Sequence, residues 1–210
     1  MYPLLSKTVL FQGDSITDCN RDRSNTDSLG DGYVKRIADV YHTLFPGSGT
    51  VFLNRGVSGD RARNLLERYE TDLLALKPDV LSVLIGINDV WRRYDNGDPT
   101  SCEDFSRSYR LLLTQVKRDL PRTKIILLEP FVLYALPDRR AWREDLDPKI
   151  QAVRELANEF ADVYIPLDGL LASDVAKGVP TESLASDGVH PTDLGHAMLA
   201  GYWLKYGCGI

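Results

Sequence analysis

Five short apolar runs recur along this chain at spacings of roughly 30 to 45 residues, and they constrain its fold more than any other feature. They are TVLF near residue 8, TVFL near 50, DVLSVLI near 79, KIILL near 124 and DVYIPL near 162. Each run has the length and the β-branched content of a buried strand. We therefore predict five strands.

The segments between these runs have the period of helices that are apolar on one face. One such segment begins after Asp60 and stops at Pro78, and two others precede Pro121 and the last strand. Their apolar positions are Ala62, Leu65, Leu66, Tyr69, Leu73 and Leu76; Phe105, Tyr109, Leu112, Val116 and Leu120; and Val153, Leu156, Ala157 and Phe160. Strands that alternate with helices predict a parallel sheet between two helical layers, the three-layer doubly wound α/β class.

Composition limits the classes of protein to which the chain can belong. Its 210 residues suit one domain, which we predict to span 1–210, and 43% hydrophobic with 26% charged residues is the mixture of a globular protein. The chain has 25 Lys and Arg residues against 30 acidic residues, and it has no dense basic run. Nucleic acid is therefore not expected as a partner.

The N-terminal sequence and the cysteines indicate the compartment. MYPLLSKTVLF lacks the basic and long apolar regions of a secretory signal, and no window approaches 18 consecutive apolar residues, so we expect a cytoplasmic protein with no membrane partner. Cys19, Cys102 and Cys208 are odd in number and form no C-x-x-C pair, which indicates free thiols and argues against structural zinc.

Polar motifs follow the predicted strands at the sheet edge where parallel α/β folds bind ligands. GDSITD follows the first strand, NRGVSGD the second and GIND the third, while DGVHPTD opens the last predicted helix. The G-x-S-x-G elbow of many serine hydrolases is absent from the sequence. The candidate chemistry must therefore be assembled from motifs that lie far apart in the chain.

Ser15, in the first motif, can act as a nucleophile only if a base removes its proton. His42 and His196 lie within predicted helices, where ordinary structural roles are expected, whereas His190 precedes Pro191, a favourable first residue of a helix. Asp187, three residues before His190, can fix the imidazole tautomer and leave its other nitrogen facing Ser15. The alternative is that Asp187 and His190 only decorate a loop.

Acyl transfer also needs donors for the developing oxyanion, and two motifs offer them. Gly59 can bring a backbone N–H close to a ligand because it has no Cβ, and Asn88 offers a side-chain amide. With the Ser15 N–H they make three donors, although a turn glycine and an Asx-turn explain Gly59 and Asn88 equally well one at a time. Asp14 and Asp89 have no further carboxylates at ligand spacing, so no metal is expected.

Taken together, GDSITD, the glycine of GVSGD, GIND and DGVH resemble the four blocks of the SGNH hydrolase superfamily, the GDSL esterases and lipases. The resemblance runs from Gly13 to His190 and implies a flavodoxin-like sheet of order 2-1-3-4-5. It implies Ser15 as nucleophile, Asp187 and His190 as its triad partners, and Ser15, Gly59 and Asn88 as the oxyanion hole. GDSITDCNR, the GYV start of a helix at Gly32 and IGINDVWR look most like the intracellular bacterial acetylxylan esterases, which implies no cofactor and a homo-oligomer.

The substrate depends on the long segments 91–101 and 130–146, which are rich in aromatic and arginine side chains. Trp91 is the first candidate for stacking on a sugar; Tyr94, Tyr134 and Trp142 are others, and each can equally be a core or oligomer contact. We expect a serine esterase that acts on short acyl, chiefly acetyl, esters of xylo-oligosaccharides or other carbohydrates. The alternatives are a thioesterase or lysophospholipase on the same machinery, and a non-catalytic sugar-binding module.

Overall fold

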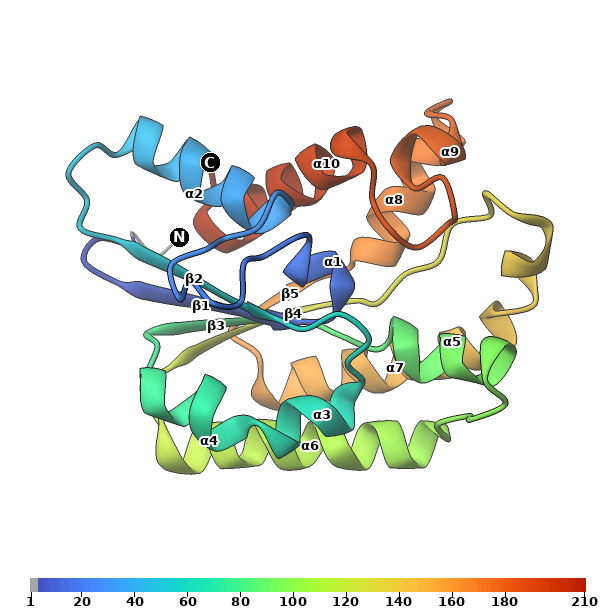
Figure 1. Cartoon of the computed structure of the whole chain (residues 1–210), viewed down its shortest axis with the longest axis horizontal. Helices are drawn as coiled ribbons and strands as arrows, with labels where there is room; N and C mark the ends of the chain where they lie inside the picture. Colours follow the sequence, from blue (N-terminus) through green and yellow to red (C-terminus); the bar gives the residue numbers. More distant parts are fainter. Residues whose placement is uncertain (1–3) are drawn as a thin grey trace.

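The computed structural model describes residues 4–210 and has a five-stranded, all-parallel sheet at its centre (Figure 1). The strand order is β2-β1-β3-β4-β5, which confirms the predicted fold class and the order implied by the family resemblance. The strands are β1 (Thr8–Gly13), β2 (Val51–Gly56), β3 (Val80–Leu84), β4 (Lys124–Leu128) and β5 (Val163–Ile165).

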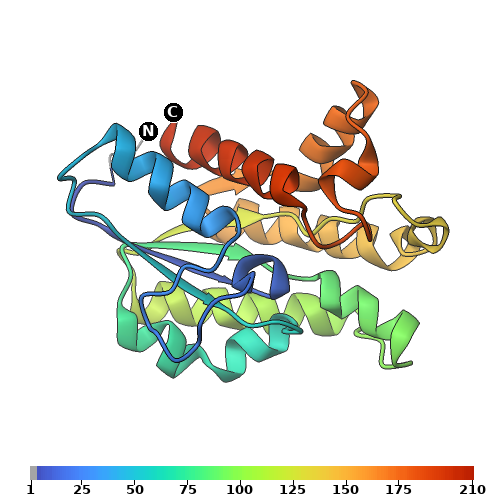
Figure 2. The same ribbon diagram turned by 45° about the horizontal axis from the view of Figure 1, so that its top comes forward.

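Helices cover both faces of the sheet, as the alternating pattern predicts (Figure 1). On one face, α2 (Tyr33–Leu44) and α10 (Asp193–Trp203) lie side by side, with α8 (Leu167–Ala176) beyond them (Figures 1 and 2). On the other face lie α3 (Ala62–Glu67), α4 (Tyr69–Asp72), α6 (Cys102–Asp119) and α7 (Arg143–Phe160). The shorter elements are α1 (Ser15–Asp18), α5 (Ile87–Asp95), α9 (Thr181–Leu184), the 3₁₀ turns η1 (Leu74–Leu76) and η2 (Pro137–Arg140), and the π-helical turn η3 (Leu204–Cys208).

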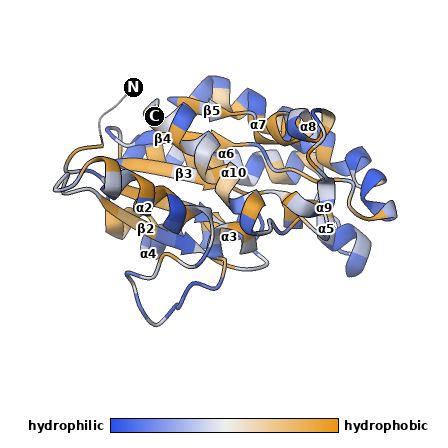
Figure 3. Cartoon of the chain, turned by 90° about the horizontal axis from the view of Figure 1, so that it is seen from above, coloured by the Kyte–Doolittle hydropathy of each residue, from blue (hydrophilic) through white to orange (hydrophobic). Residues whose placement is uncertain are grey.

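Each face of the sheet has its own hydrophobic core, because successive strand residues point to opposite faces. Val9 and Phe11 pack under α2 and α10, whereas Leu10 packs with the helices of the other face. Seen from above, the central strand β3 is strongly apolar along its length (Figure 3). Its one polar side chain, Ser82, is fully buried and accepts a hydrogen bond from Trp203 Nε1 at 3.0 Å, so α10 is fixed to the centre of the sheet.

The structure differs from the sequence prediction at two helices. The helix predicted between Asp60 and Pro78 is divided into α3, α4 and η1, with breaks at Arg68 and Leu73. Arg68 makes polar contacts at its break: its Nε donates to Asp60 at 2.8 Å, and its Nη2 donates to the distant Gly13 carbonyl at 3.4 Å. The spacing of apolar residues does not predict such contacts.

The last helix begins at Asp193 and not at Pro191. Thr192 is its N-cap, since the Thr192 hydroxyl accepts the Gly195 N–H at 3.2 Å. Pro191 and His190 therefore stay in the preceding loop. Within residues 4–210, no helix has both the length and the apolarity needed to cross a bilayer.

Candidate active site

Ser15 lies at the carboxyl end of β1, where the chain turns directly into the short helix α1. The preceding residue, Asp14, caps this helix: its Oδ1 accepts the Ile16 N–H at 3.0 Å. Ser15 is only half-buried, while its neighbours Asp14 and Ile16 are buried. The serine hydroxyl is thus held at the sheet edge by a capped turn and remains accessible.

His190 and Asp187 complete a hydrogen-bonded chain with this serine. Ser15 Oγ lies 3.0 Å from His190 Nε2, and His190 Nδ1 lies 2.7 Å from Asp187 Oδ2. The second carboxylate oxygen, Oδ1, accepts the backbone N–H groups of Val189 and His190, each at 2.8 Å. Because Nδ1 faces the carboxylate, the neutral ring carries its proton there and presents Nε2 to Ser15 as an acceptor.

The electrostatics of this pair follow from its hydrogen bonds. Burial opposes ionisation of Asp187, but the bonds from the His190 ring and from two backbone N–H groups outweigh it and lower the pKa of Asp187 to about 2. The same carboxylate raises the pKa of His190 above its usual value, against partial burial and the positive charge of Arg139. Asp187 is therefore ionised throughout the neutral range.

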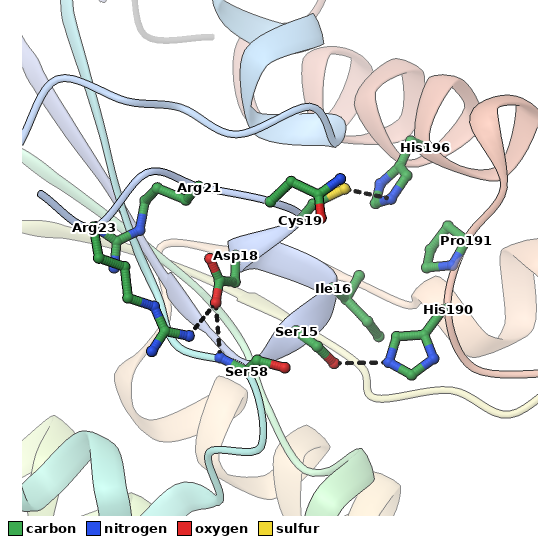
Figure 4. A pocket seen from close by; sticks show the side chains of 11 residues that line it. Ser15, Ile16, Asp18, Cys19, Arg21, Arg23, Ser58, His190, Pro191 and His196 are labelled. Carbon is green, nitrogen blue, oxygen red and sulfur yellow. Dashed lines mark hydrogen bonds and ion pairs between the residues drawn. The ribbon is translucent and has the colours of Figure 1, made fainter. Parts of the chain in front are cut away.

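A cavity of about 470 Å³ opens beside this chain and is lined by Ser15, Ser58 and His190 among others (Figure 4). On the side away from His190, Asp18 accepts the Ser58 N–H at 2.9 Å and pairs with the Arg23 guanidinium (Figure 4). The volume lies in the range of small-molecule sites. Its charged and polar walls suit a polar ligand better than a long acyl chain.

Gly59 and Asn88 belong to two neighbouring segments that meet at Asp60. Gly59 has φ +90° in the turn after β2, which Asp60 N closes by donating to Val57 O at 3.1 Å, so the Gly59 N–H takes no part in that turn bond. Asn88, on α5 and only 3% exposed, donates from Nδ2 to the Asp60 carbonyl at 3.1 Å. The structure thus fixes the Asn88 amide to the turn that carries Gly59.

Comparison with known proteins identifies the family of this chain. The family model of the GDSL-like lipases and acylhydrolases matches residues 11–198, which include Ser15, Gly59, Asn88, Asp187 and His190. The chain belongs to this GDSL-like family.

Relatives within the GDSL-like family match the chain over almost its whole length. An acetylxylan esterase of Geobacillus stearothermophilus is 34% identical over 206 residues, which are 94% of this chain and 92% of that enzyme. Its crystal structure superposes with a TM-score of 0.86 at 33% identity, covering 95% and 93% of the two chains. A protein of Parabacteroides merdae, described as a GDSL-like lipase, gives a TM-score of 0.89 at 36% identity and covers 95% and 94%.

Three solved structures of the Geobacillus enzyme are described as catalytic mutants. In these a serine, an aspartate and a histidine, in turn, are replaced by alanine. The aspartate and the histidine of that enzyme stand three positions apart.

The four aromatic residues that the sequence offers for sugar binding differ in their burial and in their distance from His190. Trp91 is half-buried, and its ring lies 5.5 Å from the His190 ring and 5.2 Å from Trp142. Trp142 is only 1% exposed, so it is a core residue and cannot stack on a sugar. Tyr94 stacks on Trp142 at 5.2 Å, and Tyr134 is 48% exposed. Trp91 therefore lies at the site, with its ring tilted against that of His190, and it packs on the buried Trp142.

The other two histidines have structural partners. His42 Nε2 lies 3.0 Å from the Thr50 carbonyl. His196 is buried in α10, where its Nδ1 accepts the Tyr33 N–H at 3.2 Å and its Nε2 lies 3.3 Å from Cys19 Sγ (Figure 4). Burial lowers the pKa of His196 to about 4, so this ring is neutral and serves as an acceptor at the start of α2.

Two buried carboxyl groups close to the site have unusual environments. Asp14 is fully buried, which raises its pKa to about 7, and its Oδ2 makes no hydrogen bond to any of residues 4–210. Burial also raises the pKa of Asp89 to about 6, and its Oδ2 accepts the Ala62 N–H at 3.1 Å. Across the described part of the chain, no three His, Cys, Asp or Glu side chains converge as metal ligands would.

Sequence reasoning missed one member of this site, Arg139. Its Nε donates to the backbone carbonyl of Asp187 at 2.7 Å, although 48 positions separate the two residues. No short motif carries such a contact. The only signal was the density of arginine and aromatic residues in segment 130–146.

Proposed function

We propose that this chain is a serine esterase that removes acetyl and similarly short acyl groups from acylated xylo-oligosaccharides or related carbohydrates. The observation that carries the proposal is the hydrogen-bonded chain from Ser15 Oγ through the His190 ring to the Asp187 carboxylate, which opens on a polar cavity. A serine hydroxyl, an imidazole acceptor and an ionised carboxylate in this order are the requirements for acyl transfer by a serine nucleophile.

In the first half of the reaction, Ser15 Oγ attacks the ester carbonyl carbon while His190 Nε2 takes the hydroxyl proton. Asp187 stabilises the imidazolium that forms and stays ionised itself. The tetrahedral anion then collapses: the bond from carbon to the alcohol oxygen breaks, and the imidazolium gives its proton to the leaving alcohol. The sugar departs with a free hydroxyl and Ser15 keeps the acyl group.

In the second half, water takes the place of the alcohol. His190 removes one proton from the water as its oxygen attacks the acyl carbon, and the proton then returns to Ser15 Oγ as the acid leaves. We assign the Ser15 N–H, the Gly59 N–H and the Asn88 amide to the oxyanion in both halves. The bond from Asn88 Nδ2 to the Asp60 carbonyl supports this assignment, because it uses one amide hydrogen and leaves the second for substrate.

The acyl and alcohol preferences follow from the relatives and from the cavity. The Geobacillus relative is an acetylxylan esterase, and its catalytic mutants change a serine and an aspartate and histidine spaced as Asp187 and His190 are here. The cavity walls hold charged side chains such as Asp18 and Arg23, which favour a polar alcohol over a lipid.

The test compares esters of increasing acyl length, an acyl-CoA and acetylated xylo-oligosaccharides with the native chain and with Ser15→Ala. We expect rapid loss of acetyl groups from the oligosaccharides, read by NMR, slow hydrolysis of long esters and of the thioester, and no activity in Ser15→Ala. Faster hydrolysis of acyl-CoA than of any acetyl ester would assign the chain to the thioesterases instead. Equal ester hydrolysis by Ser15→Ala would end the proposal.

A further inference from the structure

Arg139 is a buried arginine in a segment whose other side chains are exposed. It lies in η2 and is 6% exposed, while its neighbours Asp138 and Arg140 both face solvent. Arginine is rarely buried unless its charge and its donors have partners. The contacts of Arg139 therefore indicate why the chain keeps it inside.

The guanidinium of Arg139 is held by stacking on aromatic rings. It lies 4.0 Å from the centroid of the Trp142 ring and 5.4 Å from that of Trp91. Nη1 pairs with Asp138 Oδ2 at 2.5 Å. A planar cation over indole rings is a favourable arrangement for arginine in particular, since lysine offers no plane to stack.

A second donor, Nε, reaches the turn that carries Asp187 and His190. It bonds the Asp187 carbonyl at 2.7 Å, and the next carbonyl, that of Gly188, accepts the Leu133 N–H at 2.8 Å. Gly188 has φ +84°, and a Cβ there would lie 2.3 Å from the Leu133 carbonyl oxygen and 3.1 Å from Arg139 Cγ. The turn is thus pressed closely against the segment after β4 and bonded to it at two successive carbonyls.

The positive charge of Arg139 also acts on the His190 ring. The charged groups around this ring are Asp187 from its own loop, Asp14 from the cap of α1 and Arg139 from η2, with His196 nearby on α10. The two carboxyl groups favour the imidazolium, and Arg139 is the cation that opposes them. The indole of Trp91 contacts both the His190 ring and the guanidinium, so the three side chains form one packed unit.

We propose that Arg139 is a positioning residue, which holds the Asp187–His190 turn in register with Ser15 through its bond to the Asp187 carbonyl and its stack on Trp91 and Trp142. This inference rests on the proposed esterase function only for its kinetic readout. Two effects follow: the bond fixes the reacting geometry, and the positive charge opposes protonation of the His190 ring, which shares the Trp91 contact.

Two substitutions separate these effects, and a neighbour supplies the control. Arg139→Met keeps an unbranched apolar stem that packs on the indoles and removes both the charge and the donor. Arg139→Lys keeps the charge but loses the planar fork and the donor at the Nε position. Arg140→Met is the matched control, because Arg140 is exposed and stacks on Tyr134 at 5.1 Å, away from the turn.

Both Arg139 variants should lose roughly 10- to 100-fold in kcat on p-nitrophenyl acetate with little change in KM, since a small misplacement of a reacting group costs about this much. The midpoint of the acid limb of kcat/KM should rise in Arg139→Met, where the opposing charge is gone, and stay at the native value in Arg139→Lys. Arg140→Met should match the native enzyme. An NMR titration of the His190 ring should show the same order of midpoints without any substrate.

Native kcat in Arg139→Lys, at a temperature where circular dichroism shows both proteins folded, would overturn the positioning role. The titration midpoint of His190 should rise in Arg139→Met, and a residue needed only for folding would leave it unchanged. A midpoint that stays at the native value or falls would overturn the charge effect. If Arg139→Met does not fold, the kcat of Arg139→Lys decides alone. Should the native chain lack esterase activity, the proposed function fails, and the NMR titration of the His190 ring still tests the charge effect of Arg139.

Discussion

Asp187 and His190 are joined by two hydrogen bonds to the two oxygens of one carboxylate. Oδ1 accepts the His190 backbone N–H at 2.8 Å, and Oδ2 lies 2.7 Å from the ring nitrogen Nδ1. The first bond fixes the backbone of the turn and the second fixes the ring. Ser15 lies 175 positions earlier in the chain, and its hydroxyl contacts the free nitrogen of this ring. The contact brings the candidate nucleophile and its base together.

The first prediction concerns pH. A base must be neutral to accept a proton, so kcat/KM should rise with pH through the pKa of His190. The bond to Asp187 raises that pKa, so the midpoint should lie above the unperturbed value of about 6.5. Rates on p-nitrophenyl acetate between pH 5 and 9 measure it, and a flat profile would count against His190 as the base.

Asp187→Asn extends this prediction. The carboxylate is the largest cause that raises the pKa of His190, so without it that pKa should fall below its native value. The activity should fall on the order of 10⁴-fold, because an amide favours the wrong imidazole tautomer. An NMR titration of the ring in the native chain and the variant gives the two midpoints, and equal midpoints would contradict the assignment.

Asn88→Ala tests the side-chain donor of the oxyanion hole. Loss of one such donor lowers kcat on the order of 10²- to 10³-fold with a small effect on KM. Asn96→Ala is the matched control, since Asn96 is exposed at the end of the same helix. Asn88→Ala also loses the bond from Asn88 Nδ2 to the Asp60 carbonyl, so its thermal unfolding is measured in parallel. A kcat equal to that of the Asn96 control would remove Asn88 from the oxyanion hole.

His196 lies beside the same cavity and offers a contrast with His190. His196→Ala leaves the Tyr33 N–H at the start of α2 without its acceptor, which should lower the free energy of unfolding by about 1–3 kcal/mol. It should not move the pH midpoint of kcat/KM, because the base is His190. Urea unfolding and the pH profile of one preparation give both results. A displaced midpoint with unchanged stability would reverse the roles of the two histidines.

Asp14 should make the folded chain less stable as pH rises. Its pKa is about 7 when folded and about 3.8 when unfolded, so the folded state binds the extra proton between these values. Stability from this group is then fully present below pH 4 and is lost as the pH rises to about 7, by roughly 2–4 kcal/mol.

Asp14→Asn removes this titration and keeps the cap acceptor for the Ile16 N–H. Its free energy of unfolding should therefore depend less steeply on pH than that of the native chain between pH 5 and 8. Asp22→Asn, at an exposed position, controls for the loss of one charge. Identical slopes for the native and Asp14→Asn chains would show that Asp14 is ionised when folded.

The sheet was predictable because its signal is local and repeated. Each strand is a short apolar run, and the alternation with helices implies parallel strands with covered faces, as the structure confirms. The exact helix ends were harder to predict. The break at Arg68 coincides with side-chain bonds to Asp60 and to the distant Gly13 carbonyl, and Thr192, as the N-cap, moves the start of α10 from Pro191 to Asp193.

The candidate site also contains residues that the sequence predicts and residues that it does not. Ser15, Asp187 and His190 stand out because the chemistry of a nucleophile demands a base and a carboxylate, and the structure joins the three by hydrogen bonds, while their roles remain predictions. Arg139 could not be found from sequence, because its bond to the Asp187 carbonyl depends on how segment 130–146 folds. Trp142 was ambiguous for the same reason, and burial makes it a core residue.

Covalent labelling shows whether Ser15 is the nucleophile. The native chain is treated with a serine-directed organophosphate, its residual esterase activity is followed, and the modified peptide is identified by mass spectrometry. We predict one equivalent of label on Ser15, with activity lost in proportion to labelling and no labelling in His190→Ala. A label on another residue, or full activity in protein fully labelled at Ser15, would show that Ser15 is not the nucleophile.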